Sequence, residues 1–154
     1  MQGEDGSWFR GYDPTGTGLQ SPPEWFGASD TERKSGTIFP IEVLIELHKL
    51  TGDRPYLEAA EQAARFILQT YVEPVEYVGG LNDTTHIKSV KIDAISVMFA
   101  MRSLLKAYEA TQSRFYLEGA VRAAKVLASW VYLWNVPFPA ATYGWSKSGG
   151  AGLV

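Results

Sequence analysis

The chain has 154 residues, of which 45% are hydrophobic and 20% are charged, and its net charge is −3. It contains no apolar run near the roughly 18 to 20 residues that a membrane span requires, and no cluster of Lys and Arg that could follow a phosphate backbone. We therefore expect neither a membrane nor a nucleic acid as a partner.

Cysteine is absent, which excludes disulfide and thiolate chemistry, and no cofactor is predicted. The amino-terminal residues show no basic and apolar signal region. We expect a cytoplasmic protein as the sequence stands, or a mature form or fragment of a periplasmic or secreted protein. The compartment is left open.

Residues 1 to 36 are expected to form a long, ordered loop without a helix. Glycine and proline recur along this stretch, and its apolar periodicity is weak. Aromatic residues, among them Trp8, Tyr12 and Trp25, alternate with charged ones, whereas flexible linkers are poor in aromatics. Because long ordered loops are usually functional, this segment is expected to contribute to a binding surface.

Four helices are expected in the rest of the chain, over about 37–50, 54–71, 90–110 and 114–134. Ser35 or Thr37 is expected to cap the first of them. The helix from about 90 to 110 is apolar nearly all round, which indicates burial on several sides. The pattern predicts one all-α domain over 1–154, with a first hairpin at 37–71, a loop at 72–89, a second hairpin at 90–135 and a loop at 136–154.

The two hairpins are copies of one unit. The stretch 47–64 recurs as 107–124 at an offset of 60 residues, so that Thr51 aligns with Thr111 and Tyr56 with Tyr116. Such an offset indicates a repeat protein built from antiparallel αα-hairpins.

The turn inside each unit has its own signals. Gly52 occupies a position where a helix end favours a left-handed residue, and Asp53 is expected to cap the next helix. The second copy has Gln112 in place of Gly52 and Ser113 as the expected cap. The small residues that follow in each copy allow neighbouring helices to approach closely.

Loop lengths predict the geometry of the helices. The turns inside the hairpins are short, whereas 1–36, 72–89 and 136–154 are long. Antiparallel alternation then places all three long segments at the same end of the helices, which we expect to be the functional end. The first and third helices are expected to form an inner layer and the second and fourth an outer one.

Hairpins of this length with the turn Leu50-Thr-Gly-Asp-Arg-Pro-Tyr-Leu-Glu-Ala-Ala60 resemble the six-hairpin glycosidase superfamily. Its members are the (α/α)6 toroids of many glycoside hydrolases, some polysaccharide lyases and some sugar epimerases. Three segments are also similar to loops and helix ends of uncharacterised bacterial members: Asp5-Gly-Ser-Trp-Phe-Arg-Gly-Tyr-Asp13, Gly79-Gly-Leu-Asn-Asp83 and Trp130-Val-Tyr-Leu-Trp-Asn135. The hairpin resemblance spans nearly all of 37–135.

This resemblance implies a carbohydrate-active protein, most simply a bacterial glycoside hydrolase that acts on an oligo- or polysaccharide. A closed ring of six such hairpins needs about 360 residues at this repeat length, so the chain would supply an arc of about two hairpins. The expected partners are therefore the remaining hairpins of a larger chain, or further copies of this one. Because an open arc leaves apolar flanks, we expect the isolated chain to self-associate.

Glycoside cleavage generally uses two carboxyl groups, about 5 to 5.5 Å apart for retention or about 6.5 to 9.5 Å apart for inversion. Asp83 follows a Gly-Gly turn, and Asp93 opens a mostly apolar helix, where burial would raise its pKa toward that of a general acid. We predict these two as the catalytic pair, with His86 between them as a proton relay and no metal. In the simpler alternative, Asp83 ends a turn, Asp93 is a first-turn carboxylate that the helix dipole stabilises, and His86 is a surface or hydrogen-bonded histidine.

The expected saccharide contacts are aromatic rings that stack on sugar faces and polar residues near them: Trp8, Arg10, Tyr12, Trp25, Asn82, Lys91, Trp134, Asn135 and Trp145. Fold alone does not establish function. A non-catalytic sugar-binding or helical scaffold module therefore remains an alternative, as does a lyase or epimerase of the same fold. A tetratricopeptide-like peptide binder is disfavoured because that repeat has about 34 residues.

Overall fold

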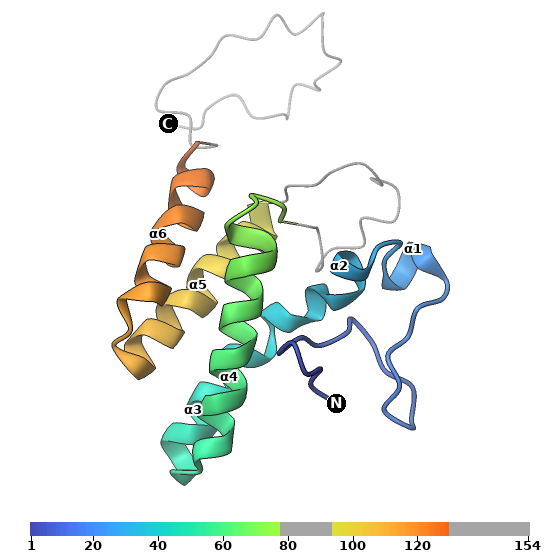
Figure 1. Cartoon of the computed structure of the whole chain (residues 1–154), viewed down its shortest axis with the longest axis horizontal. Helices are drawn as coiled ribbons and strands as arrows, with labels where there is room; N and C mark the ends of the chain where they lie inside the picture. Colours follow the sequence, from blue (N-terminus) through green and yellow to red (C-terminus); the bar gives the residue numbers. More distant parts are fainter. Residues whose placement is uncertain (78–93, 130–154) are drawn as a thin grey trace, which may run out of the picture.

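The computed structural model describes residues 1–77 and 94–129, and this part of the chain is helical and contains no strand (Figure 1). In chain order the elements are α1 (Pro23–Phe26), α2 (Asp30–Arg33), the 3₁₀ helix η1 (Lys34–Ile38), α3 (Pro40–Thr51), α4 (Arg54–Ile67), the π-helical turn η2 (Leu68–Val72), α5 (Ala94–Thr111) and α6 (Arg114–Ala128). The prediction of an all-α protein is confirmed for these residues.

The amino-terminal segment differs from the predicted uninterrupted loop, because it contains α1 and α2. The start of α2 has a Ser-x-x-Glu arrangement that the sequence interpretation missed, and it differs from a capping box in that Glu32 binds the N–H one residue before the N-cap Ser29. The Ser29 hydroxyl accepts a hydrogen bond from the Glu32 backbone N–H at 3.1 Å, and the Glu32 carboxylate accepts one from the Ala28 N–H at 2.8 Å. This Ser-x-x-Glu pattern satisfies backbone donors that a helix start leaves unpaired.

The two turns between helices are held by the same pair of side-chain hydrogen bonds, which the sequence interpretation assigned to the wrong residues. Asp53 and Ser113 occupy the expected N-cap positions, but neither side chain makes a capping hydrogen bond. Instead, the Thr51 hydroxyl donates to the Leu47 carbonyl at 2.8 Å and accepts from the Asp53 N–H at 3.1 Å. Thr111 makes the equivalent pair, at 2.7 and 3.2 Å, so the repeated threonine is what holds both turns.

The expected cap of the first long helix is also wrong. Ser35 donates its hydroxyl to the Glu32 carbonyl oxygen, and Thr37 donates to the carbonyl oxygen of Lys34. Both residues lie in η1, and the N-cap position of α3 is held by Phe39 without a side-chain hydrogen bond. Their hydroxyls are therefore engaged before α3 begins.

Residue 112 offers a direct test of the turn. Gln112 has φ 58°, the left-handed conformation that its repeat partner Gly52 adopts at φ 78°. Because this conformation is costly for a residue with a Cβ atom, we expect Gln112→Gly to raise the free energy of unfolding by about 0.5–1 kcal/mol. Urea unfolding followed by circular dichroism measures the change. A loss of stability would show that the side chain of Gln112, which donates to the Glu109 carbonyl, outweighs the backbone strain.

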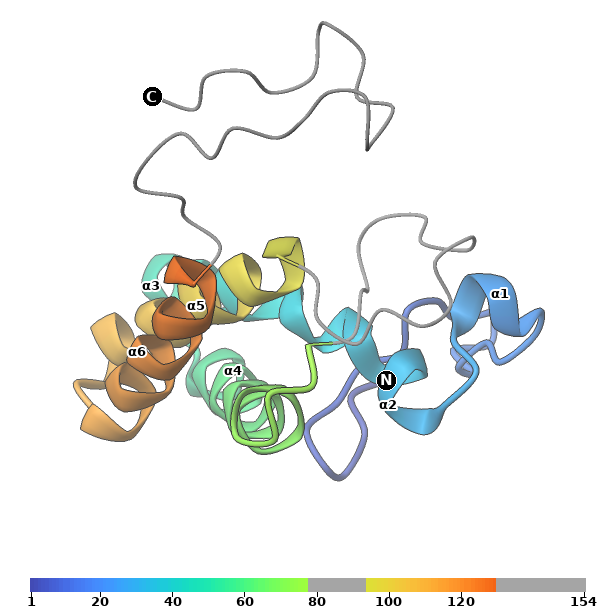
Figure 2. The same cartoon turned by 90° about the horizontal axis from the view of Figure 1, so that it is seen from above.

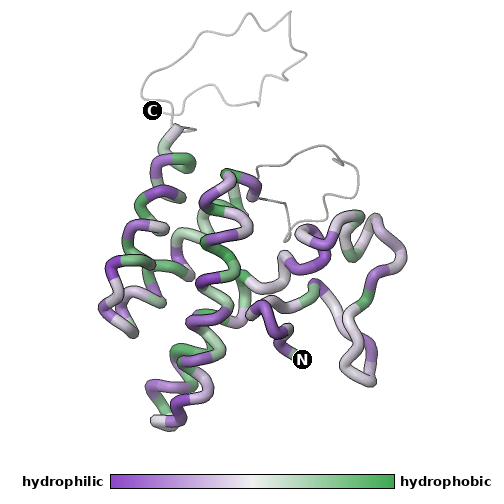
Figure 3. Tube along the Cα trace, viewed as in Figure 1, coloured by the Kyte–Doolittle hydropathy of each residue, from purple (hydrophilic) through white to green (hydrophobic). Residues whose placement is uncertain are grey.

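The helices pack as two linked hairpins. α3 packs against α4 and α5, α5 against α6, and α6 against η2 at the end of α4. Hydrophobic and hydrophilic residues alternate along α4 and α6 (Figure 3), as in helices with one buried face. The core between them contains Ile45, Ile67, Leu68 and Leu104, each at most 2% exposed.

Residues at equivalent positions of the two units contact each other. The rings of Phe39 and Phe99 lie 5.9 Å apart between centroids, and Arg102 forms an ion pair with Glu42 at 3.0 Å. The members of each pair are 60 residues apart in sequence. The second unit is therefore placed on the first in register, with like positions side by side.

The amino-terminal segment lies on the other side of α4 from α6 (Figures 1 and 2). The Gln2 side chain donates to the Ala59 carbonyl at 2.9 Å. Gly6, at φ +85°, lies so close to α4 that a Cβ atom there would be 2.5 Å from the Gln62 carbonyl oxygen. The first residues of the chain therefore cover the flank of α4 that α6 leaves open.

Candidate functional site

An aromatic pocket of about 400 Å³ lies between the amino-terminal segment and the start of α3. Its lining consists of Trp8, Phe9, Tyr12, Gly36, Phe39, Pro40, Val43 and Leu44. The pocket is open to solvent, since Phe39 is 44% and Val43 is 60% exposed. It is at the opposite end of α3 from the Gly52 turn, which is the end where the sequence predicts the functional surface.

One side of the pocket is formed by three aromatic residues of the amino-terminal segment, Trp8, Phe9 and Tyr12, which we call the aromatic wall. Phe9 and Tyr12 meet edge to face, with 6.0 Å between ring centroids. The Tyr12 hydroxyl accepts from the Phe9 N–H at 2.8 Å and donates to the Met1 carbonyl oxygen at 3.0 Å. These two hydrogen bonds fix the hydroxyl end of the Tyr12 side chain and therefore restrict the orientation of its ring.

The wall is attached to η1 by close backbone contact. The Trp8 N–H donates to the Thr37 hydroxyl at 2.8 Å. The chain also passes so near Gly36 that a Cβ atom there would be 2.4 Å from the Phe9 carbonyl oxygen. Glycine is therefore required at residue 36 for the wall to lie where it does.

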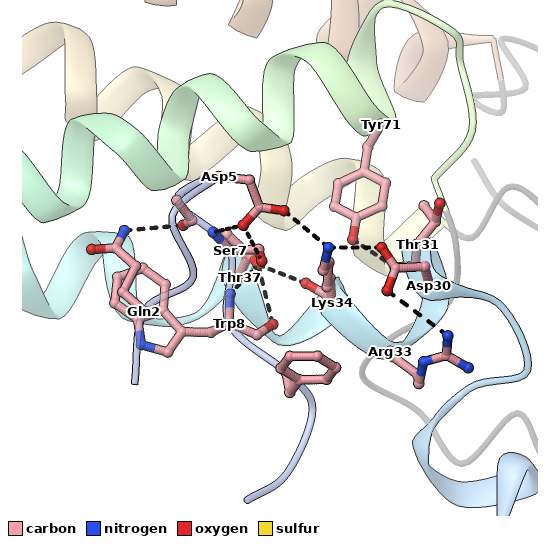
Figure 4. Close-up of polar contacts among 12 residues, drawn as sticks. Gln2, Asp5, Ser7, Trp8, Asp30, Thr31, Arg33, Lys34, Thr37 and Tyr71 are labelled. Carbon is pink, nitrogen blue, oxygen red and sulfur yellow. Dashed lines mark hydrogen bonds and ion pairs between the residues drawn. The ribbon is translucent and has the colours of Figure 1, made fainter. Parts of the chain in front are cut away.

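Charged groups tether the same segment (Figure 4). Lys34 lies between two carboxylates, 3.0 Å from Asp5 and 2.7 Å from Asp30. Asp5 also accepts from the Ser7 hydroxyl at 2.6 Å. Beside this group, the buried Tyr71 hydroxyl donates to the Thr31 carbonyl at 2.9 Å, and burial raises the pKa of Tyr71 well above its ordinary value. The network connects the segment to η1, α2 and η2.

We call Lys34, Asp5, Asp30 and Ser7 the tether, and their contacts shift the pKa values of Asp5 and Lys34. Burial raises the pKa of Asp5, but hydrogen bonds from Ser7 and Lys34 outweigh it and bring the pKa below the ordinary 3.8. Hydrogen bonds to Asp30 and Asp5 raise the pKa of Lys34 above 10.5. The Asp5 contribution is therefore present above pH 3.8 and lost as the pH falls through its lowered pKa. The Lys34 contribution is present below pH 10.5 and lost as the pH rises through its raised pKa.

We expect the protection of the Trp8 amide against hydrogen exchange, corrected for intrinsic rates, to fall as the pH drops below 3.8. The reason is that protonated Asp5 no longer holds Lys34. Asp5→Asn should lower the protection at pH 6 and remove most of the acid-dependent fall, and the Leu104 amide in α5 serves as a control for general unfolding. Equal profiles for Trp8 in the wild type and the variant would show that the tether does not hold the wall.

The repeat explains why a pocket exists at this place. Phe39 and Leu44 in the first unit correspond to Phe99 and Leu104 in the second. Leu104 is fully buried, and Phe99 is half-buried against Phe39. At the start of α3, Phe39 and Leu44 share the pocket with Trp8, Phe9 and Tyr12, which belong to an irregular segment and not to a helix. That segment covers them incompletely, and the uncovered apolar surface becomes the pocket.

The structure brings together two of the four predicted contact residues that it describes. Trp8 and Tyr12 line the pocket. Arg10 follows the wall, where its backbone N–H donates to the Arg33 carbonyl at 2.8 Å, but it does not line the pocket. Trp25 does not line it either, and lies 68% exposed on α1. Arg10 and Trp25 therefore lie outside this pocket, and the prediction that these four residues contact one saccharide stays a prediction.

The remaining predicted residues lie outside the described part of the chain: Asn82, Asp83, His86, Lys91, Asp93, Trp134, Asn135 and Trp145. Sequence reasoning missed Phe9, Phe39 and Val43, which complete the pocket. The recurrence of Phe39 as Phe99 was a usable signal, because a position of the first repeat has a like neighbour on one side only, and its other side meets a non-repeated segment.

The lining of the pocket is suited to binding a ligand with apolar faces and a hydrogen-bond acceptor. Its lining residues include aromatic rings and aliphatic side chains and no Asp, Glu, His or Lys. No hydrogen bond from the Trp8 indole N–H to another described residue is present, so this donor can serve a ligand. Within residues 1–77 and 94–129, no group of acidic residues and histidines could hold a metal ion, and no helix is long and apolar enough to cross a membrane.

Comparisons of the chain with protein-family models, with curated proteins and with solved structures found no match. The fold and the site define a class only at the level of an all-α protein with two αα-hairpins in register and an aromatic pocket at one end. The resemblance to six-hairpin glycosidases thus remains a prediction from the residues.

Proposed function

We propose that this chain binds carbohydrate in the pocket of Trp8, Phe9, Tyr12 and Phe39, as part of a glycoside hydrolase-like protein. The observation that carries the proposal is the pocket itself: an open, aromatic-lined surface at the end of the helices where the long segments are expected to gather. Pyranose rings present flat C–H faces to aromatic rings, and ligand sites are typically concave and mostly apolar with a few polar groups.

The held position of the wall supports the same function. Aromatic side chains contribute most when their orientation is fixed before binding, because less conformational entropy is then lost. Here Tyr12 is held by hydrogen bonds at its hydroxyl, and the Trp8 backbone is held by Thr37. The indole N–H of Trp8 supplies a hydrogen-bond donor at the edge of the ring.

The proposed architecture is an arc of an (α/α)6-type toroid, with α3 and α5 in an inner layer and α4 and α6 in an outer one. What supports it is the register between the units, in which Phe39 meets Phe99 and Glu42 meets Arg102. Figure 1 shows both short turns toward the same side of the helices. The pocket is lined by residues at the start of α3, at the other end of that helix from its turn. A sugar bound there would lie at the rim of the ring.

The catalytic part of the proposal depends on Asp83, Asp93 and His86, for which two-carboxylate chemistry remains the prediction. The second candidate function is a non-catalytic sugar-binding module. It is favoured by one observation, that the residues lining the pocket include no titratable acid or histidine. A lyase or an epimerase of the same architecture stays possible on the resemblance alone.

The test is a calorimetric screen of neutral and acidic oligosaccharides against the wild type, two pocket variants and one control variant. Trp8→Ala removes one ring. Val43→Lys places a longer side chain in the pocket, and this position tolerates it because Val43 is 60% exposed in the wild type. Each is expected to weaken binding at least 2- to 10-fold, the equivalent of about 0.5–1.5 kcal/mol for one aromatic contact. Trp25→Ala is the matched control and should bind as the wild type does. If all three variants bind equally well, the pocket is not the site.

A further inference from the structure

Phe39 lines the pocket and also contacts the second unit. Its side chain is 44% exposed, and its ring meets the Phe99 ring of α5 with 5.9 Å between centroids and an interplanar angle of 53°. Phe39 occupies the N-cap position of α3, and no side-chain hydrogen bond caps that helix. The Phe99 ring therefore supplies a surface from the second unit against which the Phe39 ring is set.

A charged residue of the second unit holds Phe99 in turn. The guanidinium carbon of Arg102 lies 5.8 Å from the Phe99 ring centroid, within the roughly 6 Å over which a cation is attracted to the face of a ring. Arg102 Nη2 also donates to the Glu42 carboxylate at 3.0 Å. Glu42 follows Phe39 by one helical turn, and Arg102 follows Phe99 by one turn. The four side chains therefore link α3 and α5 at two levels, one turn apart.

The two units carry opposite charges at one pair of equivalent positions. Phe39 and Phe99 have the same side chain, whereas Glu42 and Arg102, at the next level, are acidic and basic. Two acidic or two basic residues at this level would repel each other across the contact. The second unit thus differs from the first at the position where an arginine both pairs with Glu42 and lies over the Phe99 ring.

We propose that Arg102 is a positioning residue of the pocket, which it does not itself line: through the Phe99 ring it fixes the orientation of the Phe39 ring. A phenylalanine that is nearly half exposed has room for more than one rotamer. A ring that is already oriented loses less conformational entropy when a ligand stacks on it. This role rests on the proposed function for the identity of the ligand alone, a saccharide.

Removal of Arg102 is expected to change the pocket without unfolding the chain. The Arg102 and Glu42 side chains are 51% and 27% exposed, and ion pairs at a surface contribute little to the stability of a protein. A cation over a ring at an exposed site is likewise a weak contact. The loss of both contacts should therefore alter which orientations Phe39 adopts, while the packing of α3 on α5 persists.

The first measurement follows the Phe39 side chain directly and needs no ligand. Three-bond NMR couplings from Phe39 Cγ to the backbone nitrogen and carbonyl carbon report the populations of its χ1 rotamers. We expect the couplings of a single rotamer in the wild type and averaged couplings in both Arg102→Gln and Phe99→Leu. Wild-type couplings in either variant would overturn the proposal.

Two further variants separate the positioning role from a general effect of charge. Arg102→Lys keeps a cation that can approach the ring, so its couplings should be closer to those of the wild type than the couplings of Arg102→Gln. Lys106→Gln removes one positive charge from the same helix, where the ion pair of Lys106 lies within α5, and should leave Phe39 unchanged. Equal averaging in Lys106→Gln and Arg102→Gln would contradict a specific role of Arg102.

The second measurement is calorimetric titration of the same variants with cellohexaose and with the tightest-binding oligosaccharide of the screen. Arg102→Gln is expected to weaken binding about 2- to 5-fold, the equivalent of one cation–π contact at an exposed site, with little change in Tm. Lys106→Gln should bind as the wild type does. Averaged Phe39 couplings with unchanged affinity would overturn the proposal. If no oligosaccharide binds the wild type, the proposed function fails, whereas averaged couplings in Arg102→Gln would still support the effect of Arg102 on Phe39.

Discussion

Replacing Gly36 by alanine is expected to detach the aromatic wall from η1 and to abolish ligand binding in the pocket while the helices stay folded. A Cβ atom at residue 36 would lie 2.4 Å from the Phe9 carbonyl oxygen and 2.9 Å from its carbonyl carbon. These are backbone atoms, which a change of rotamer cannot move. The wall must therefore shift as a whole, and Trp8, Phe9 and Tyr12 leave their places together.

The measurements are binding of the best oligosaccharide from the screen, far-ultraviolet circular dichroism, and limited proteolysis of the amino-terminal segment. Binding should fall below detection, helix content should be unchanged, and cleavage before residue 36 should become faster. The matched control is Gly52→Ala, which meets no atom within 4 Å. It should cost about 1 kcal/mol of stability for its positive φ and leave binding intact. A Gly36→Ala protein that binds normally would show that the wall is not part of the site.

The second large effect is on stability and uses a pair of equivalent leucines. Leu104→Ala is expected to lower the free energy of unfolding by about 2–5 kcal/mol, because the side chain is fully buried and its removal leaves a cavity. Leu44→Ala at the equivalent position should cost less, since Leu44 is only partly buried and its removal enlarges a pocket that is already open.

Urea unfolding of the two variants measures the difference. Leu44→Ala should also change oligosaccharide affinity, because Leu44 lines the pocket, and Leu104→Ala should not, once the protein is folded. Equal losses of stability would mean that Leu44 is as well covered as Leu104, and that the pocket closes in solution.

The repeat made the hairpins predictable from the sequence. Gly52 at the helix end and the 60-residue offset placed both turns correctly, and the left-handed Gln112 follows from the alignment of the two copies. The caps were not predictable in the same way. Thr51 and Asp53 both carry an acceptor oxygen near the same N–H groups, and only the backbone path decides that the threonine is used.

The candidate site was predicted in part. The aromatic content of the amino-terminal segment pointed to Trp8 and Tyr12, which line the pocket. Phe39 and Val43 could not be distinguished from core residues, because an apolar helix position reveals its exposure only when its neighbours are known. Trp25 shows the opposite problem, since the sequence predicted it in the same loop as Trp8, whereas it lies 68% exposed on α1 and does not line the pocket.

The most direct test of carbohydrate binding in this pocket is an NMR titration that follows the indole N–H signals of the tryptophans as an oligosaccharide from the screen is added. The Trp8 indole and the backbone amides of Gly36, Phe39, Val43 and Leu44 are expected to shift together along one saturable curve, while the Trp25 indole stays in place. Saturable shifts at Trp25 or elsewhere, with the Trp8 indole and these amides unchanged, would contradict carbohydrate binding in this pocket.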